Sequence, residues 1–289
     1  MNNALVNTIP HSGTHLVTTI LNSFGYNQSI IRNRFYSVKP YFRRSQLAGI
    51  NWRSAKDLSN ITSLNQKKTI LVSVASPRLA RPKVIESLFS KIAEREYIIG
   101  HIPYSDESNE LIDRYITKTI TIIRDPRDMA LSMINHVKTR PQHHAHKYFF
   151  GQLTTDSERL EAILFGYENT FGHMSSVASM YNSMLQWQKQ PHNLTIRFED
   201  LVGLKGGGET KNQISCIKSL CTHLELSENF DDASILNIAK NSFGTSGTFR
   251  KGKIGGWSDV FTFEDKQLFR SAISDLLVEL GYETSNAWS

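Results

Sequence analysis

The stretch ALVNTIPHSGTHLVTTILNSF, residues 4–24, decides the fold of this protein. It opens with a short apolar run from Ala4 to Ile9 and continues through the polar turn Pro10 to Thr14. It ends in a helix-like stretch from His15 to Phe24. This order predicts a strand, a tight loop and a helix.

The loop of this stretch is suited to an anion. A helix N-terminus carries unpaired amides and a partial positive charge. Ser12 and Thr14 add hydroxyl groups, and Gly13 lies between them. A simple helix cap after a strand explains the same residues, so the loop alone leaves both interpretations open. The P-loop signature G-x-x-x-x-G-K-S/T is absent, which argues against an ordinary ATPase or kinase.

Further apolar runs, rich in β-branched residues, predict more strands. The runs cover Thr69–Val74, Tyr97–Ile99, Thr117–Ile123 and Asn193–Arg197. Helices are predicted from Pro82, from about Asp125 to His136, over Ser157–Phe165 and over Ser175–Gln188. Strands that alternate with helices predict a parallel sheet with helices on both faces. We expect a single α/β domain over residues 1–289.

The polar clusters follow the predicted strands, and open α/β sheets bind ligands at the carboxyl ends of their strands. Arg124 ends the clearest strand, and Ser132 lies two helical turns later, so a guanidinium and a hydroxyl can hold one phosphate. A capping pair of Arg124 with Asp125 or Asp128 is the alternative. The run FRKGKIGGW, residues 249–257, places cations beside glycines that allow close approach to an anion, or it is a mobile surface loop.

The composition narrows the class of partner. Lys and Arg number 33 against 27 Asp and Glu, a formal net charge of +6 that is not gathered into a run. We therefore expect a small polyanionic ligand rather than nucleic acid. No apolar run approaches the ~20 residues of a membrane span, and Met1 to Ile9 does not read as a secretory signal. The cysteines, Cys216 and Cys221, fit a reducing cytoplasm and predict neither a disulfide framework nor a metal site.

Six segments together resemble the PAPS-dependent sulfotransferase family, where PAPS is 3′-phosphoadenosine 5′-phosphosulfate. They occur in family order over residues 8–262. The segments are TIPHSGT (8–14), GHIP (100–103), RDPRDMALS (124–132), FEDL (198–201), NSF (241–243) and RKGKIGGW (250–257). The resemblance implies a P-loop-NTPase-like fold, a central parallel β-sheet flanked by helices on both faces.

The resemblance also implies roles for residues, with PAPS as co-substrate, PAP as product and no metal. The 5′-phosphosulfate is expected at His11, Ser12, Gly13, Thr14 and His15. The 3′-phosphate is expected at Arg124, Ser132, Arg250, Lys251 and Gly252. The remaining nucleotide contacts are expected from Phe198, Ser242 and Phe243, with Phe243 on the adenine. His101 is the candidate general base and His11 a second catalytic residue.

The chain departs from the family pattern at several motif positions. His11 replaces the loop lysine, and we expect it to act as imidazolium or as a neutral hydrogen-bond donor. Phe198 replaces a tyrosine, Leu16 a tryptophan and Gly256 an aspartate. The family's dimer motif matches only at Thr262, so we expect a monomer or a weak homodimer.

The expected acceptor is a small molecule with a hydroxyl or an amine, such as a secondary metabolite of the guanidinium alkaloid type. Sulfation of a carbohydrate or lipid, or a nucleotide kinase, are the alternatives. Segments 27–64 and 137–156 are expected to shape the acceptor pocket. His143, His144 and His146 predict a flexible acceptor lid rather than a zinc site. Asp106 and Glu107 fit either a helix start or a contact with a cationic acceptor.

Overall fold

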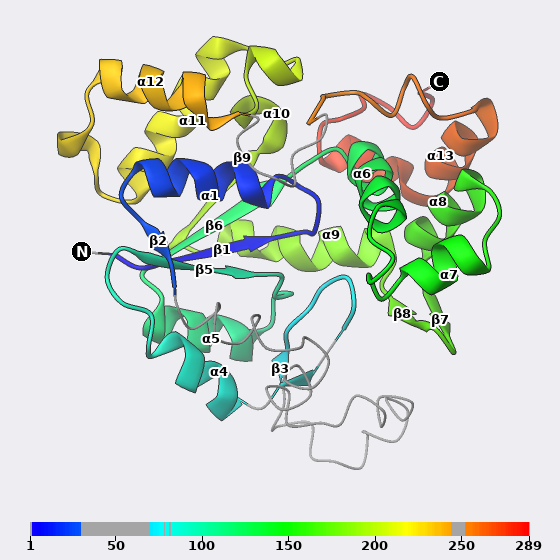
Figure 1. Cartoon of the computed structure of the whole chain (residues 1–289), viewed down its shortest axis with the longest axis horizontal. Helices are drawn as coiled ribbons and strands as arrows, with labels where there is room; N and C mark the ends of the chain where they lie inside the picture. The colour runs from blue at the N-terminus through cyan, green and yellow to red at the C-terminus, as the bar shows by residue number, and fades with distance from the viewer. Residues whose placement is uncertain (1, 30–69, 78, 81, 244–251, 289) are drawn as a thin grey trace.

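The computed structural model describes residues 2–29, 70–77, 79–80, 82–243 and 252–288. Its centre is a sheet of five parallel strands in the order β2-β5-β1-β6-β9 (Figure 1). The strands are β1 (Ala4–Thr8), β2 (Asn27–Gln28), β5 (Glu96–Gly100), β6 (Lys118–Ile123) and β9 (Asn193–Arg197). The predicted parallel sheet is confirmed, and the strand that opens the deciding stretch lies at its middle.

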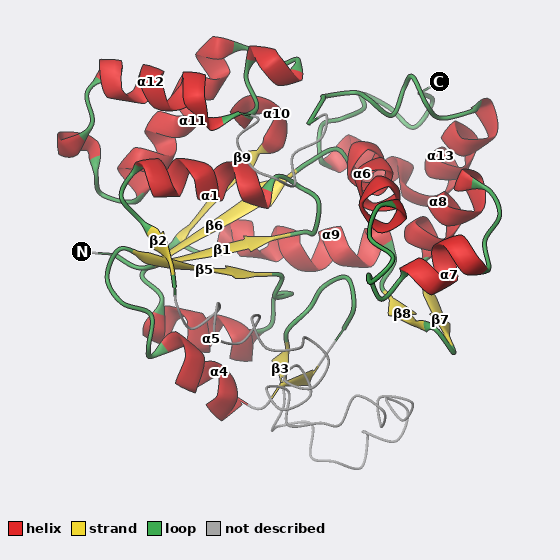
Figure 2. Cartoon of the chain, viewed as in Figure 1, coloured by secondary structure: helices red, strands yellow, loops and turns green. Residues whose placement is uncertain are grey.

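Helices cover both faces of the sheet, as predicted (Figure 2). Successive side chains of a strand point to opposite faces, so Ala4 and Val6 enter one core cluster while Leu5 enters the other. The cluster that contains Ala4 and Val6 is covered by α1 (Thr14–Ser23), α10 (Phe198–Leu201), α11 (Thr210–His223) and α12 (Asp232–Ser242). The cluster that contains Leu5 is covered by α4 (Pro82–Phe89), α5 (Asp106–Tyr115) and α9 (Val177–Leu185).

A second group of helices extends the fold beyond the carboxyl ends of the strands (Figure 1). It consists of α6 (Pro126–Lys138), α7 (His146–Gly151), α8 (Asp156–Phe165) and α13 (Phe263–Glu279). The smaller elements are β3 (Ile70–Leu71), β4 (Leu79–Ala80), β7 (Tyr167–Asn169), β8 (Gly172–Met174), η4 (Gln186–Lys189), η5 (Leu204–Gly206) and η6 (Ser227–Asn229).

Capping residues explain where several helices begin. Asp125 caps α6 by accepting the amide of Arg127, and Pro126 takes the first position, where its missing N–H costs nothing. Thr155 and Glu158 form a capping box at the start of α8. Asp106 opens α5, which agrees with its interpretation as a helix-start carboxylate.

Three sequence-based predictions of secondary structure are wrong in part. The run Thr69–Val74 contributes β3, which pairs antiparallel with β4 and not with the central sheet, and one isolated parallel bridge from Ser73 to His101. No helix was predicted within segment 137–156, which contains α7 with a fully buried Phe149. The helix predicted over 175–188 ends at Leu185 and continues as the 3₁₀ turn η4. In each case tertiary packing overrides the local pattern.

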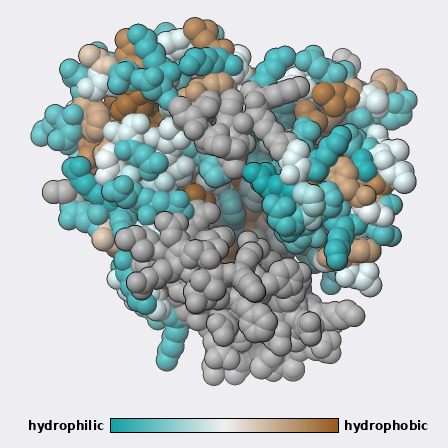
Figure 3. Space-filling view, viewed as in Figure 1, coloured by the Kyte–Doolittle hydropathy of each residue, from teal (hydrophilic) through white to brown (hydrophobic). Residues whose placement is uncertain are grey.

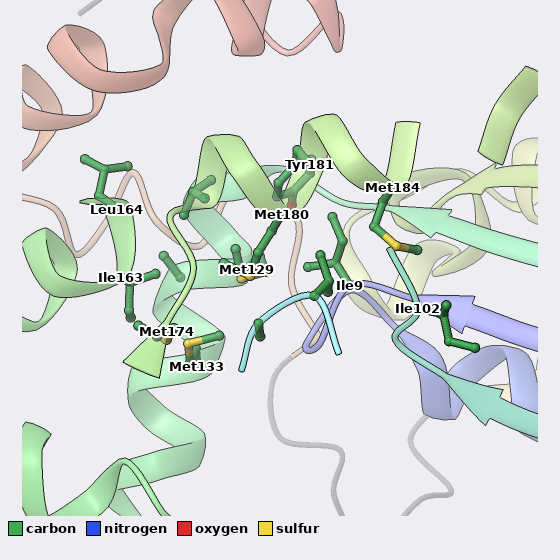
Figure 4. Close-up of a cluster of buried hydrophobic side chains, with 14 of the residues drawn as sticks. Ile9, Ile102, Met129, Met133, Ile163, Leu164, Met174, Met180, Tyr181 and Met184 are labelled. Carbon is green, nitrogen blue, oxygen red and sulfur yellow. The ribbon is translucent and has the colours of Figure 1, made fainter. Parts of the chain in front are cut away.

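A methionine-rich cluster supports the loop that follows β1. Figure 4 shows Ile9, the residue directly after β1, beside Met180, Tyr181 and Met184 of α9. The unbranched thioether side chains fill irregular gaps between elements. The start of the first loop therefore packs against buried side chains of α9.

The outside of the molecule is mostly hydrophilic on the face drawn in Figure 3. There the surface is recessed between the part that carries α1 and α12 and the part that carries α6 and α7. Among the described helices, none is both long and apolar enough to cross a bilayer. Cys216 and Cys221 are free, buried thiols on α11.

Candidate active site

The first loop connects β1 to α1 through two residues with positive φ, His11 at 69° and Gly13 at 114°. Ser12 is fully buried, and its hydroxyl donates to the carbonyl of Ile9 at 2.7 Å. The hydroxyl thus stabilises the turn from inside. No side chain from the described residues caps α1, which leaves this helix N-terminus suited to an anion.

Glycine at position 13 is required by a close approach of two segments. A Cβ on Gly13 would lie 2.6 Å from Cδ2 of Phe198, which opens α10 after β9. The ring of Phe198 in turn lies under the guanidinium of Arg124, whose carbon is 4.3 Å from the ring centroid. Phe198 therefore joins the first loop to the end of β6.

Arg124 brings together the loops that the sequence motifs placed far apart. Its side chain is 7% exposed; Nη1 donates to the carbonyl of His11 at 3.0 Å, and Nη2 to that of Lys253 at 3.4 Å. Its Nε is buried without a partner among the described residues. The capping alternative is not what forms, because Asp125 pairs with Arg127 and Asp128 binds elsewhere.

Asp128 holds the loop of residues 252–262, called the third loop here, a role that sequence reasoning missed. Its carboxylate accepts the amide of Gly255 at 2.8 Å and that of Trp257 at 3.0 Å. Burial raises the pKa of Asp128, while the charge of Arg124 and the two amide hydrogen bonds act in the opposite direction. The second Asp of the RDPRD run is the sequence signal that could have found this contact.

His101 lies directly after β5, and its ring contacts the end of β1. Nδ1 of His101 is 2.6 Å from the carbonyl oxygen of Thr8. A carbonyl oxygen only accepts, so Nδ1 carries the hydrogen and Nε2 keeps its lone pair. The following residue, Ile102, is fixed by Asn7, whose side-chain amide both donates to its carbonyl (3.0 Å) and accepts from its amide (2.7 Å). Sequence reasoning missed Asn7.

Four histidine rings form a row that starts at the first loop. Ring centroids lie 4.7 Å apart for His11 and His136, 5.5 Å for His136 and His143, and 4.3 Å for His143 and His144. Burial, followed by the charges of neighbouring histidines and Arg124, holds the pKa of His11 well below its ordinary value. In the part of the chain that the structure describes, no three side chains form a group able to hold a metal ion.

The expected adenine side is built around Gly206. A Cβ on Gly206 would lie 2.7 Å from the carbonyl of Gly252 and 3.0 Å from Cε2 of Phe243. The amide of Ile254 donates to the carbonyl of Gly206 at 2.9 Å. The glycine-rich turn 203–208 thus brings Phe243 and Gly252 together.

The remaining expected residues lie around this assembly. Ser132 is half-buried on α6, two turns after Arg124, and His15 is exposed in the first turn of α1. Ser242 is buried at the end of α12, where its hydroxyl donates to Ala239. Arg250, Lys251 and most of segment 27–64 lie outside the described residues.

Comparison with known proteins gives a family. The model of the sulfotransferase domain matches residues 2–281. The mouse sulfotransferase SULT7A1, solved with PAP, has a TM-score of 0.59 and 16% identity over 97% of this chain and 87% of its own. A retinol dehydratase solved with androsterone and inactive cofactor PAP has a TM-score of 0.48 and 18% identity over 95% and 80%.

A search of curated proteins found no match. The mouse structure supports the fold, while the domain model covers nearly the whole chain. The chain therefore belongs to the sulfotransferase family, as its six motif segments predicted.

Proposed function

We propose that this chain, as a single domain, moves the sulfuryl group of PAPS onto a hydroxyl or amine of a small acceptor and releases PAP. The observation that carries the proposal is the position of Arg124, which binds the first and third loops and lies over Phe198. These are the loops that the family uses for the two ends of one nucleotide. The mouse protein of similar fold was solved with PAP.

The residues around Arg124 fit a phosphate. A buried guanidinium whose Nε finds no partner among the described residues can donate a further hydrogen bond to a ligand, and its charge favours an anionic one. A phosphate offers several oxygens to the planar fork of an arginine. We assign the 3′-phosphate to Arg124, Ser132 and Gly252, together with Arg250 and Lys251 from the motif.

The other end of the nucleotide is assigned to the first loop. Gly13, Thr14 and His15 stand at the N-terminus of α1, where amides and the helix dipole favour the phosphosulfate. Ser12 holds the turn through Ile9, and His11 lies beside it. The adenine is assigned to Phe243, with Phe198 and Ser242 near it.

His101 is assigned as the base that takes the proton of the acceptor. The carbonyl of Thr8 fixes the hydrogen on Nδ1, so the lone pair of Nε2 is the one that can accept a proton. PAPS, when bound, supplies the sulfuryl group, and PAP leaves as the sulfur–oxygen bond to its phosphate breaks. His11, neutral at its lowered pKa, donates a hydrogen bond toward that phosphate.

The donor assignment is tested by calorimetry with PAP. We expect Arg124→Met to weaken PAP binding about tenfold to a hundredfold, the range for hydrogen bonds to a charged group. Arg114→Met is the matched control, because Arg114 forms an exposed pair with Glu86. Absence of PAP binding by the unchanged protein, or tighter binding of ATP than of PAP, would overturn the proposal.

The acceptor is tested by transfer of labelled sulfate from PAPS to alcohols, phenols, amines and sugars. A guanidinium alkaloid, which the resemblance suggested, belongs in that panel beside neutral and acidic compounds. A labelled product that requires His101 supports the proposed reaction. A product that forms equally well with His101→Ala argues against His101 as the base.

A further inference from the structure

The turn that carries the proposed base, residues 100–104, is held by two buried side chains from outside the motif segments. This turn directly follows β5, at the carboxyl end of the central sheet. Asn7 of β1 and Trp187 of η4 bond its backbone. Asn7 is fully buried and Trp187 is 1% exposed. The function proposed above gives neither of them a role.

Asn7 holds the peptide that follows His101 through both ends of its side-chain amide. The oxygen accepts the amide of Ile102 at 2.7 Å, and the nitrogen donates to the carbonyl of Ile102 at 3.0 Å. A side-chain amide can do this because it offers an acceptor and a donor together. The last backbone pair of β1 with β5 is Asn7 with Gly100, so the side chain extends this pairing into the turn.

Gly100 leaves the space that this contact requires. It lies opposite Asn7 in the sheet, and a Cβ there would stand 3.2 Å from the side-chain oxygen of Asn7 and 3.0 Å from Cδ1 of Leu5. A side chain at position 100 would therefore press on the Asn7 amide. The first residue of the GHIP segment is thus matched to a residue of β1 that lies outside every motif segment.

Trp187 holds the same peptide from the helical side. Its indole N–H donates to the carbonyl of Ile102 at 2.9 Å, so this carbonyl accepts from two buried side chains. The amide of Tyr104 donates to the carbonyl of Ser183 on α9 at 3.1 Å, and the rings of Tyr104 and Trp187 meet edge to face with centroids 5.2 Å apart. Ile102 itself belongs to the buried cluster of Figure 4. The turn is therefore fixed to β1 on one side and to α9 and η4 on the other.

These contacts determine where the ring of His101 can lie. The carbonyl of His101 accepts the amide of Val74 at 2.8 Å, and the next peptide is the one that Asn7 holds. Only two side-chain torsions remain once this backbone is fixed, and each has few favourable values. The ring reaches the carbonyl of Thr8, the residue directly after Asn7, at 2.6 Å. That hydrogen bond places the hydrogen on Nδ1.

We propose that Asn7 and Trp187 are positioning residues for the base of the sulfuryl transfer. They hold the peptide after His101 so that its ring keeps the hydrogen bond to Thr8. This inference rests on the proposed function, because it takes His101 as the base. Neither residue is assigned a contact with the nucleotide, so both act on the rate of transfer rather than on PAPS binding. A catalytic group must be held to within about 0.5 Å, and an error of about 1 Å can cost a hundredfold in rate.

The first test observes the His101 ring directly and needs no turnover. Proton–nitrogen correlation spectra at mildly alkaline pH distinguish an imidazole with its hydrogen on Nδ1 from one with it on Nε2, and His101→Gln identifies the signal. We expect only the Nδ1–H form in the unchanged protein. Asn7→Leu keeps the approximate size of the side chain but removes both hydrogen bonds, and we expect it to give a mixture of the two forms. An unchanged His101 signal in Asn7→Leu overturns the inference.

Asn3→Leu is the matched control. The side chain of Asn3, at the opposite end of the same strand region, also bonds backbone groups. It accepts the amide of Thr117 at 2.8 Å and donates to the carbonyl of Tyr115 at 2.9 Å. We expect Asn3→Leu to lower stability but to leave the His101 signal unchanged.

The second test separates the transfer step from binding. It uses PAPS and the acceptor that gives the highest turnover among the labelled-sulfate compounds. We expect kcat to fall about tenfold to a hundredfold in Asn7→Leu, while PAP affinity by calorimetry stays within about threefold. Asn3→Leu is expected to keep kcat. Equal kcat values for Asn7→Leu and Asn3→Leu overturn the inference.

Trp187→Phe keeps the inference testable when Asn7→Leu does not fold. It retains an aromatic ring and removes the indole N–H donor. We expect a minor Nε2–H form of His101 and a fall in kcat of about threefold to tenfold, the range for one neutral hydrogen bond. Tyr104→Phe is the control, because it removes a hydroxyl that contacts Asp106 and leaves the neighbouring ring in place. Unchanged kcat and an unchanged His101 signal in Trp187→Phe overturn the role of Trp187.

The two proposals fail in different ways. Loss of PAP binding in the unchanged protein removes the proposed function itself. A labelled product from the unchanged protein, together with a His101 ring that responds to neither Asn7→Leu nor Trp187→Phe, removes only the positioning roles.

Discussion

His101 and His11 are the imidazoles of the proposed site, and their surroundings differ. The ring of His101 is oriented by the Thr8 carbonyl, which keeps the hydrogen on Nδ1. The ring of His11 instead stands in a row of bases that lowers its pKa. Hydrogen bonding thus determines the tautomer of the first, and burial with nearby cations determines the charge of the second.

Removal of the His101 side chain is expected to abolish turnover without releasing the nucleotide. A general base contributes about 10²- to 10⁴-fold to a rate, so His101→Ala should lose that factor in kcat. PAP affinity, measured by calorimetry, should stay within about threefold, because Thr8 and His101 are not among the assigned phosphate contacts. His192→Ala, at an exposed histidine, is the control. Near-normal kcat in His101→Ala would contradict the base assignment.

His11 is expected to make the folded protein less stable in acid. Its pKa is lower when folded than when unfolded, so the folded state binds fewer protons below the ordinary value of about 6.5. The contribution of His11 to the free energy of unfolding is therefore complete above the ordinary pKa and is lost as the pH falls toward the lowered pKa. Melting temperatures from pH 8 to 5 should fall less steeply in His11→Gln than in the unchanged protein. Parallel curves would show that His11 is not the group responsible.

The loops after the strands are held by one another as well as by hydrogen bonds of their own. Asp128, in the first turn of α6, binds two amides of a loop more than a hundred residues later in the chain. Arg124 binds carbonyls of two loops at once. The position of each loop therefore depends in part on the other elements.

Asp128→Asn is expected to loosen the third loop. An asparagine amide has one oxygen in place of two, and its NH₂ group would face an N–H donor. PAP affinity should fall about tenfold, the cost of one unsatisfied buried donor, while kcat at saturating PAPS changes less. Asp259→Asn is the control from the same loop, because Asp259 only pairs with the exposed Lys253 ammonium. Equal PAP affinity in both variants would exclude a positioning role for Asp128.

At the scale of the whole molecule, Arg127 ties the residues near the C-terminus to the site. Its guanidinium binds Asp125 at 2.8 Å and also contacts Glu283. It lies over the rings of Trp257, at 3.9 Å, and Trp288, at 4.8 Å. The segment after α13 is thereby fixed against the third loop.

Arg127→Leu is expected to destabilise the protein by about 3–5 kcal/mol, because it leaves the buried carboxylate of Asp125 and the half-buried one of Glu283 without their partner. Urea unfolding measures the change in free energy. Arg114→Leu, which removes only an exposed pair with Glu86, should cost about 0–1 kcal/mol. Similar free energies of unfolding for the two variants would contradict the importance of this buried cluster.

Much of the fold could be predicted because its signals are local. β1, β6 and β9 are short apolar runs between polar turns; β1 and β6 each differ from the prediction by one residue at one end, and β9 matches it. The run 69–74 has the same pattern but does not join the sheet, since pairing partners are not encoded in periodicity. The burial of Phe149 could not be predicted from periodicity either, because it depends on helices from elsewhere in the chain.

The sequence by itself determined the parallel sheet, the family and the loops that carry the motif residues, because side-chain periodicity and motif spacing are properties of short stretches. Only the tertiary structure decided that Arg124 meets His11 and Lys253, that Asn7 holds Ile102, and that His136 stands beside His11. These contacts join residues about a hundred or more positions apart. They form when parallel strands place their carboxyl ends at one edge of the sheet.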